Sequence, residues 1–348
     1  MAKSARLAAA IAAALAMVPA AAEACSRVTY LGPEGTVVTG RSMDWMVPVH
    51  TNLWAFPAGL RRSGGAAVNP LTWTSKYGSV IAAGYDAATT DGMNEKGLVA
   101  NLLYLSTAEY GARDPARPGL TIAGWTQYVL DSFATVAEAV AALRDGDVQV
   151  VDVTLPGGFS APTHLSISDP SGDSAIFEYL GGKLVIHHGR QFQVMTNEPS
   201  YDQQLALDAY WKEIGGAAML PGTARPADRF VRASYYLSQS PETADPVTSV
   251  AAMFSIMRNV SVPMGVDQPG QPNVAPTLWR TVSDQKNRVY YFDATSSPNV
   301  FWVSLDKLDL ASGRPTMKLA LDGETLAGDA AGAFAPAEPF AFLGEAAR

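Results

Sequence analysis

Cysteine is scarce in this sequence, and the scarcity is the first constraint on its class. Cys25 is the one cysteine among 348 residues, so the chain cannot form an internal disulfide and is not a small scaffold held by several bridges. Histidine is also scarce, with four in the chain. His187 and His188 are adjacent, and neighbouring strand residues point to opposite faces. They are poorly placed to chelate one ion, and we expect no metal site.

Clustered positive charge is missing as well. Lys and Arg number 25 against 33 Asp and Glu, a formal net charge of −8. Nucleic-acid binding needs clustered basic side chains that neutralise phosphates, so we expect none. After the first 24 residues, no apolar run reaches the roughly 18 residues typical of a membrane-spanning helix. Neither G-x-S-x-G nor H-E-x-x-H occurs, which argues against an α/β-hydrolase serine enzyme and a zincin.

The first 24 residues have the three parts of a secretory signal peptide. Lys3 and Arg6 give a positive start, and an Ala-rich apolar run from Leu7 to Val18 follows. Ala22-Glu23-Ala24 matches an A-x-A cleavage site. We therefore predict export, to the periplasm or the medium, and cleavage after Ala24. Cys25 would then be the first residue of the mature chain.

A cysteine directly after a hydrophobic leader is also where bacterial lipoproteins are lipidated. Lipoprotein signals prefer a larger aliphatic residue three positions before the cysteine, whereas this chain has Ala22. A lipidated α-amine could not act as a base. A lipid-anchored binding protein without turnover is the alternative from another class, and the motifs that follow Cys25 weigh against it.

Strand-like and helix-like patterns occupy separate parts of the chain. Helical spacing marks Thr121 to Arg144 and segments at about 201–214, 227–239 and 246–258. Segregated strand and helix runs predict an α+β fold, with helices packed on antiparallel sheets. We expect a single domain over residues 25–348. Three further expectations are an irregular segment at 48–79, a turn at Asp91 to Asn94 and a poorly ordered Ala-, Gly- and Pro-rich tail from about Leu326.

A hairpin is expected directly after the cleavage point. Ser26 to Tyr30 and Thr36 to Thr39 are strand-like, and turn residues separate them. A turn centred on Pro33-Glu34 places Cys25 opposite Ser42. Arg41 and Asp44 flank that position.

This cluster suits a reactive terminal cysteine. The thiolate is the reactive species, and a guanidinium such as that of Arg41 favours it. A free α-amino group has a pKa of about 7.7–8.0, so the amine of Cys25 can accept the thiol proton. Asp44 could orient that amine or hydrogen-bond the thiol. An oxyanion hole must then come from backbone N–H groups or an amide side chain.

Short motifs occur in a fixed order along the chain. They are Cys25-Ser26-Arg27, Gly40 to Trp45, Asn94 to Leu98, Thr196 to Tyr201 and Asp228 to Arg232. The series resembles the choloylglycine hydrolase family of N-terminal-nucleophile (Ntn) hydrolases, which contains penicillin V acylases and bile salt hydrolases. The resemblance implies a four-layer αββα sandwich and, often, a homotetramer. Many Gram-positive relatives begin at Cys after only the initiator Met, whereas Gram-negative relatives often carry an export signal.

The resemblance also implies a role for each matching residue. Cys25 matches the nucleophile, and Arg41 matches the arginine beside it. Asp44 matches the aspartate that contacts the amine of the nucleophile. Asn197 matches the asparagine whose side chain helps to form the oxyanion hole. Arg229 matches a second active-site arginine.

Tyr104 corresponds to the position whose backbone N–H completes the oxyanion hole. Bile salt hydrolases usually have Asn there, whereas penicillin V acylases often have Tyr. A tyrosine removes an amide donor and adds a flat apolar face. Trp45 could add a second aromatic wall for the substrate, while Trp54, Trp73 and Tyr85 are expected in the core or along the acyl pocket. We expect cofactor-free hydrolysis of a linear N-acyl amide, with penicillin V or an N-acyl homoserine lactone favoured and a conjugated bile salt the alternative.

Overall fold

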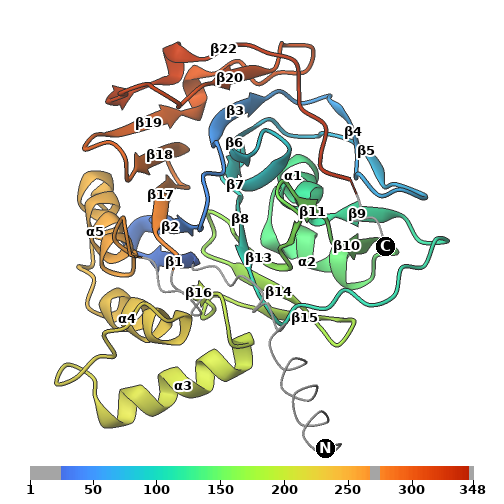
Figure 1. The fold of residues 1–348 in the computed structure, drawn as a ribbon. Coiled ribbons are helices and arrows are strands. Elements are labelled where there is room, and N and C mark those ends of the chain that lie inside the picture. Colours follow the sequence, from blue (N-terminus) through green and yellow to red (C-terminus); the bar gives the residue numbers. More distant parts are fainter. Residues whose placement is uncertain (1–24, 267–274, 345–348) are drawn as a thin grey trace, which may run out of the picture.

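Two large β-sheets lie face to face in the computed structural model, and helices cover the outer side of each (Figure 1). The structure describes residues 25–266 and 275–344; the predicted signal peptide, residues 1–24, lies outside them. On one side lie α3 (Tyr201–Ile214), α4 (Pro226–Ser238) and α5 (Pro246–Asn259). On the other side lie α1 (Ile122–Ser132) and α2 (Val136–Arg144). These layers confirm the predicted αββα sandwich.

The first sheet runs in the order β16-β1-β2-β17-β18-β19-β21. Its strands are β1 (Cys25–Leu31), β2 (Val37–Asp44), β16 (Val194–Thr196), β17 (Thr277–Asp284), β18 (Val289–Ala294), β19 (Val300–Ser304) and β21 (Gly328–Asp329). The second sheet runs in the order β15-β14-β13-β8-β7-β6-β3-β20-β22. Its strands are β3 (Asn52–Phe56), β6 (Ser79–Gly84), β7 (Ala88–Asn94), β8 (Val99–Tyr104), β13 (Thr163–Ser168), β14 (Ser174–Leu180), β15 (Lys183–His188), β20 (Met317–Leu319) and β22 (Ala335–Pro336). Neighbours in the described part of both sheets run antiparallel, except β19 with β21.

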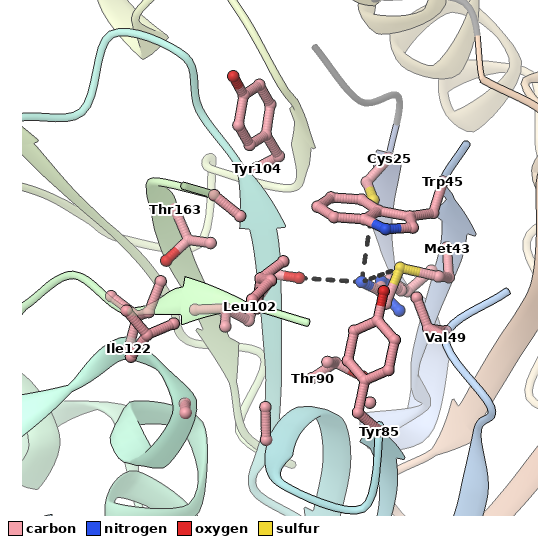
Figure 2. Close-up of a pocket in the computed structure, with 17 residues that line it drawn as sticks. Cys25, Met43, Trp45, Val49, Tyr85, Thr90, Leu102, Tyr104, Ile122 and Thr163 are labelled. Carbon is pink, nitrogen blue, oxygen red and sulfur yellow. Dashed lines mark hydrogen bonds between the residues drawn. The ribbon is translucent and has the colours of Figure 1, made fainter. Parts of the chain in front are cut away.

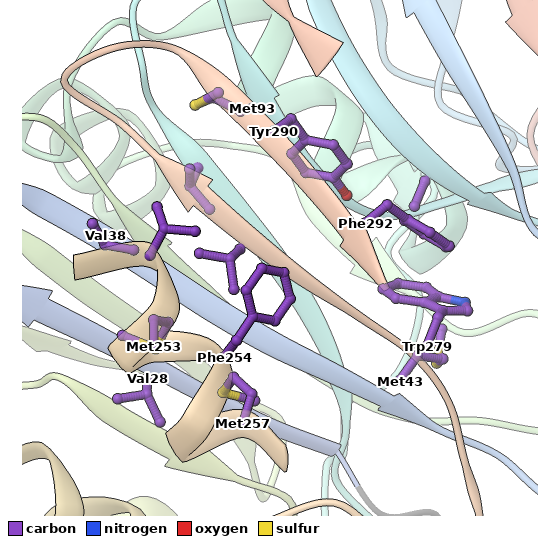
Figure 3. Close-up of a cluster of buried hydrophobic side chains, with 14 of the residues drawn as sticks. Val28, Val38, Met43, Met93, Met253, Phe254, Met257, Trp279, Tyr290 and Phe292 are labelled. Atoms are coloured by element: carbon purple, nitrogen blue, oxygen red, sulfur yellow. The ribbon is translucent and has the colours of Figure 1, made fainter. Parts of the chain in front are cut away.

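Alternating side chains let the first sheet pack on both of its faces. Val28 and Val38 face α5, where Met253 and Met257 cover them (Figure 3). On the opposite face, Met43, Trp279 and Phe292 join side chains of the second sheet, such as Met93, in one buried cluster. Two apolar layers of this kind hold the central strands β1 and β2 rigidly between helix and sheet.

The hairpin forms as predicted, but its register differs by one residue. Leu31 pairs with Val37, so Cys25 lies opposite Met43 and not opposite Ser42. The cause is the turn, which holds an odd number of residues and places Glu34 at its tip with φ 55°. A one-residue slip changes which side chains share a face. Cys25 therefore shares its face of the sheet with Arg41, while the side chain of Asp44 points to the other face.

The predicted helix over Thr121 to Arg144 is interrupted. It divides into α1 and α2, because Thr135 caps the start of α2. In this capping box the Thr135 side chain accepts from Glu138 N, and the Glu138 carboxylate accepts from Thr135 N. The second helix ends at Arg144 as predicted.

The turn expected at Asp91 to Asn94 is instead part of β7, and the chain turns just after it. Asp91 is buried, and its carboxylate accepts hydrogen bonds from Tyr290 Oη and Asn101 Nδ2. These buried partners supply the hydrogen bonds that the carboxylate needs, so Asp91 does not have to lie in a turn exposed to water.

Two segments expected to be irregular are more ordered than their composition suggests. Within 48–79, β3 alternates between the two cores, and the short strands β4 (Arg61–Ser63) and β5 (Thr72–Thr74) pair with each other. The tail beyond Leu326 contributes β21 and β22. Its Phe340 packs edge-on against Trp54, with ring centroids 5.2 Å apart. Burial of such aromatic side chains outweighs the low propensity of an Ala-, Gly- and Pro-rich segment.

The remaining short elements complete the fold. They are the strands β9 (Gly119–Thr121), β10 (Gln149–Val151), β11 (Thr154–Leu155) and β12 (Phe159–Ser160), and the 3₁₀ turns η1 (Pro33–Gly35), η2 (Leu305–Lys307) and η3 (Ala331–Ala333).

Gly92 in β7 provides a test of how closely this strand lies against α1 and against its neighbouring strand β6. A Cβ at Gly92 would lie 2.6 Å from Ile81 Cγ2, 2.8 Å from the Val80 carbonyl oxygen and 2.9 Å from Leu130 Cδ1. A backbone carbonyl cannot move aside cheaply, so Gly92→Ala should lower the free energy of unfolding by about 1–3 kcal/mol in urea denaturation. Gly222→Ala is the control, because a Cβ there meets nothing within 4 Å. It should change stability by less than about 0.5 kcal/mol, and equal losses in both variants would contradict this packing.

Candidate active site

Cys25 begins β1 and is almost wholly buried, with 2% of its surface exposed. Its Sγ lies 3.8 Å from Arg41 Nη2 and 3.9 Å from the Asp44 carbonyl oxygen. Figure 2 shows the thiol at one end of a pocket, beside Trp45 and Met43. The thiol is therefore positioned by the neighbouring strand of the predicted hairpin.

Arg41 is buried between the sheets, next to the thiol. Its Nη2 donates a hydrogen bond of 2.9 Å to the Leu102 carbonyl of the second sheet. The guanidinium also lies over the Trp279 ring, 4.5 Å from the centroid, where a cation is attracted by the ring. The position of Arg41 beside Sγ favours the thiolate over the thiol.

The Asp44 carboxylate lies on the helix side of β2, away from Arg41. It accepts hydrogen bonds from Thr277 Oγ1 and, at 3.4 Å, from Ser42 Oγ. Arg229 Nη1 is 3.9 Å from its Oδ2. Burial raises the pKa of Asp44 to about 6, and the charge of Arg229 and these hydrogen bonds hold the pKa below the value that burial alone would give.

Asn197 follows β16 and bridges the two sheets with its side-chain amide. Its Oδ1 accepts hydrogen bonds from the backbone nitrogen of Cys25 and, at 2.8 Å, from Arg229 Nη2. Its Nδ2 donates to the Tyr104 carbonyl oxygen at 2.8 Å. One amide thus joins the nitrogen of Cys25, a buried cation and the end of β8.

Arg229 lies in the first turn of α4 and is completely buried. It donates to the Cys25 carbonyl oxygen at 2.7 Å, to Ser26 Oγ and to the Ala224 carbonyl oxygen at 2.9 Å. Desolvation lowers the pKa of Arg229, whereas the nearby Asp44 raises it. A residue that would by default be a surface arginine at a helix start is here the central donor of the site.

An apolar pocket opens from the thiol toward the second sheet and α1. It encloses about 590 Å³ when its open mouth is counted. Besides Cys25 and Arg41, its walls are Met43, Trp45, Val49, Gly84, Tyr85, Ala88, Thr90, Leu102, Tyr104, Ile122, Ala123, Val153, Leu155, Ala161 and Thr163. In Figure 2, Ile122 and Thr163 lie across the pocket from Trp45. Trp45 and Tyr85 line the pocket, whereas Trp54 is buried in the core and the partly buried Trp73 packs against that core.

The structure thus brings every predicted site residue to one place, but the sequence did not reveal Thr277, which supports one of them. Thr277, which holds the Asp44 carboxylate, carries no motif and is found only through the pairing of β17 with β2. Tyr85, which was expected in the core or along the acyl pocket, lines the pocket from the turn between β6 and β7, where its φ is 57°. A left-handed tyrosine is uncommon and often marks a functional site, but the conformation cannot be read from the sequence.

Within residues 25–266 and 275–344, no three acidic, histidine or cysteine side chains are arranged to hold a metal ion. His187 and His188 indeed have different partners, Glu178 and Asp173 respectively. Every helix in these residues also falls short of the length and apolarity needed to cross a bilayer.

Comparison with known proteins decides the family. Residues 25–319 match the model of the linear amide C–N hydrolases, choloylglycine hydrolase family. The chain belongs to the choloylglycine hydrolase family. It is therefore a hydrolase of linear amides, and the family match begins at Cys25, the residue predicted to become the N-terminus.

Relatives within the choloylglycine hydrolase family differ in their similarity to this chain. A penicillin V acylase from Pectobacterium atrosepticum is 50% identical, with 92% of each chain covered. The structure of a penicillin V acylase from Agrobacterium tumefaciens is 53% identical with a TM-score of 0.87, covering 92% of this chain and 100% of that one. A bile salt hydrolase/transferase from Clostridium perfringens is 23% identical, covering 82% of this chain and 94% of that one. The bile salt enzymes are thus the more distant relatives.

Replacing Arg229 tests the buried pair with Asp44. Arg229→Met leaves a buried carboxylate without its cation, which should cost about 3–5 kcal/mol of stability. The pKa of Asp44, already raised in the folded protein, should rise further. Stability gained from a raised carboxyl pKa is present at low pH and lost as pH rises through that pKa. The deficit of the variant in the free energy of unfolding should therefore be larger at pH 8 than at pH 5.

Arg232→Met is the matched control for this measurement. Arg232 lies on the same helix, and its Nη1 donates to the Pro221 and Thr223 carbonyls. Its removal should give a deficit that is nearly the same at pH 5 and pH 8. If the loss in the free energy of unfolding of Arg229→Met is also the same at pH 5 and pH 8, the pKa of Asp44 does not depend on this cation.

Proposed function

We propose that Cys25 is the nucleophile of this amide hydrolase and becomes the N-terminal residue when a signal peptide is removed after Ala24. The observation that carries the proposal is the convergence on Cys25: Arg41 lies beside its Sγ and Asn197 on its backbone nitrogen. The match of the family from residue 25 onward supports the same start. Export to the periplasm or the medium follows from the predicted leader.

The reaction needs only groups that the chain supplies. The α-amine of Cys25 accepts the thiol proton, since an α-amino group has a pKa of about 7.7–8.0. The thiolate attacks the amide carbonyl, and the tetrahedral intermediate collapses to a thioester when the amine leaves with that proton. Water then attacks the thioester, which releases the acid and restores the thiol. The net change is amide plus water to acid plus amine, without a cofactor.

Asn197 is suited to receive the oxyanion of the intermediate. An amide nitrogen carries two hydrogens, and the bond from Nδ2 to the Tyr104 carbonyl uses one of them. We assign the second hydrogen, together with the backbone N–H of Tyr104, to the oxyanion. In this scheme Arg41 stabilises the thiolate. Arg229 holds the Cys25 carbonyl oxygen from the opposite face of the sheet, and Asp44 provides the carboxylate beside Arg229.

The pocket favours an aromatic or alkyl acyl group. Trp45, Tyr85 and Tyr104 provide flat walls next to the thiol, which suits a phenoxyacetyl or fatty acyl chain better than a hydroxylated steroid. We therefore propose the small N-acyl amides penicillin V or N-acyl homoserine lactones as substrates, with conjugated bile salts the second candidate. The likeness to penicillin V acylases supports this order. A homo-oligomeric, tetrameric assembly is proposed from the family resemblance.

The nucleophile is tested with three forms of the chain. A form that retains the leader should be nearly inactive, because Cys25 then has an amide nitrogen and no basic amine. A form with Met directly before Cys25, which the host can trim, should be active. Cys25→Ser in that form should lose activity by about 100-fold or more while remaining folded.

Intact mass identifies the first residue of the protein in each preparation. It also distinguishes an enzyme with a free N-terminal cysteine from the lipid-anchored alternative. The active form should have the mass of a chain that begins at unmodified Cys25. Full activity of a form shown to be uncleaved, or a diacylglyceryl adduct on active protein, would refute the N-terminal-amine reaction.

Substrate preference is tested by kcat/KM for penicillin V, decanoyl homoserine lactone and glycocholate on one preparation. The kcat/KM for penicillin V or for decanoyl homoserine lactone should exceed that for glycocholate by about tenfold or more. Apolar pockets discriminate by about 1–3 kcal/mol per methylene. Tyr104→Asn keeps the backbone N–H and should shift the ratio toward glycocholate. If glycocholate ranks first for the unaltered enzyme, the aromatic-pocket argument is wrong.

A further inference from the structure

The direction of the Asn197 amide depends on a short connecting segment. Residues 197–200 join β16 to α3 and lie outside both elements. Asn197 must nevertheless bring its side chain to the nitrogen of Cys25, to Arg229 and to Tyr104 at once. A loop without its own strand partners cannot hold such geometry unless other groups anchor its backbone.

Gln204 is the anchor that bonds the backbone on both sides of the Asn197 side chain. Its Nε2 donates to the carbonyl oxygens of Asn197 at 2.9 Å and Pro199 at 2.6 Å, and it lies 3.4 Å from the carbonyl oxygen of Thr196. Its Oε1 accepts from Thr196 Oγ1 at 3.1 Å. Gln204 is completely buried in the first turn of α3. Both ends of this amide are therefore used, and its rotation would break bonds to the whole segment.

The same anchor connects the segment to the helix that carries Arg229. Thr196 Oγ1, which Gln204 contacts, also lies 2.9 Å from the Pro226 carbonyl oxygen at the start of α4. At the other end of the segment, the Glu178 carboxylate accepts from Tyr201 N at 3.0 Å. Gln204 is thus the member of this network that contacts the backbone of Asn197 itself.

We propose that Gln204 is a positioning residue of the active site, which holds the Asn197 backbone so that the Asn197 amide faces Cys25 and the oxyanion. This inference rests on the oxyanion role proposed for Asn197. Gln204 touches no reacting atom and acts only through Asn197. Displacing a catalytic group by about 1 Å can cost roughly 100-fold in rate. The loss of the anchor should therefore appear in kcat, with little change in KM.

The first measurement compares Gln204→Met with Gln203→Met. Methionine has similar length and cannot replace the amide hydrogen bonds. Gln203 is the exposed neighbour on the same helix, so its replacement should leave kcat unchanged. Gln204→Met should lower kcat by about 10- to 100-fold with KM within about threefold. Alkylation of Cys25 by iodoacetamide should slow by much less than kcat falls, because alkylation forms no oxyanion and does not need the Asn197 amide to receive one.

A double-mutant cycle with Asn197→Ala separates positioning from general stability. If Gln204 acts through Asn197, the double variant should have the kcat of Asn197→Ala alone within about twofold. Additive losses, or an unaltered kcat in Gln204→Met, would overturn the inference while leaving the role of Asn197 intact. An unaltered kcat in Asn197→Ala would instead refute the proposed oxyanion role itself. If Gln204→Met does not fold, Gln204→Asn keeps a buried amide one methylene shorter and enters the same cycle.

Discussion

The buried guanidinium of Arg229 is the interaction on which the arrangement of the site depends. It reaches the main chain of Cys25, the side-chain amide of Asn197 and the Asp44 carboxylate, which come from β1, the end of β16 and the end of β2. A buried cation is tolerated only where acceptors and a counter-charge surround it. Because these acceptors come from separate elements, satisfying Arg229 also fixes how α4 and the first sheet meet around Cys25.

The charged residues of the site lie on both faces of the first sheet. Arg41 lies on the inner face of β2 and contacts the Cys25 sulfur, whereas Asp44 lies on the outer face with Arg229. The second sheet and α1 supply most of the apolar wall that would hold an acyl group. Asp44 and Arg229 are thus kept away from the apolar pocket, whereas Arg41 lines the pocket next to the thiol, where its cation favours the thiolate.

Much of the fold follows from local patterns, and the errors have a common cause. The hairpin after Cys25 was predicted from turn residues, but its register was wrong by one because Glu34 adopts a left-handed conformation at the tip. Asp91 was assigned to a turn because aspartate favours turns. In the sandwich its carboxylate is satisfied by Tyr290 and Asn101 instead. Propensity describes a residue without its distant partners, and these positions are decided by distant partners.

The sequence by itself determined the α+β class, the family and the candidates Cys25, Arg41, Asp44, Asn197 and Arg229, because these rest on residue identity and order. Only the tertiary structure decided which face each side chain occupies and what holds it there. Thr277 on Asp44 and Gln204 on the Asn197 segment carry no motif. Their effect depends on side-chain direction and on contacts between elements far apart in the chain. Burial of charge across several elements is a property of the assembled layers, and no local stretch of sequence encodes it.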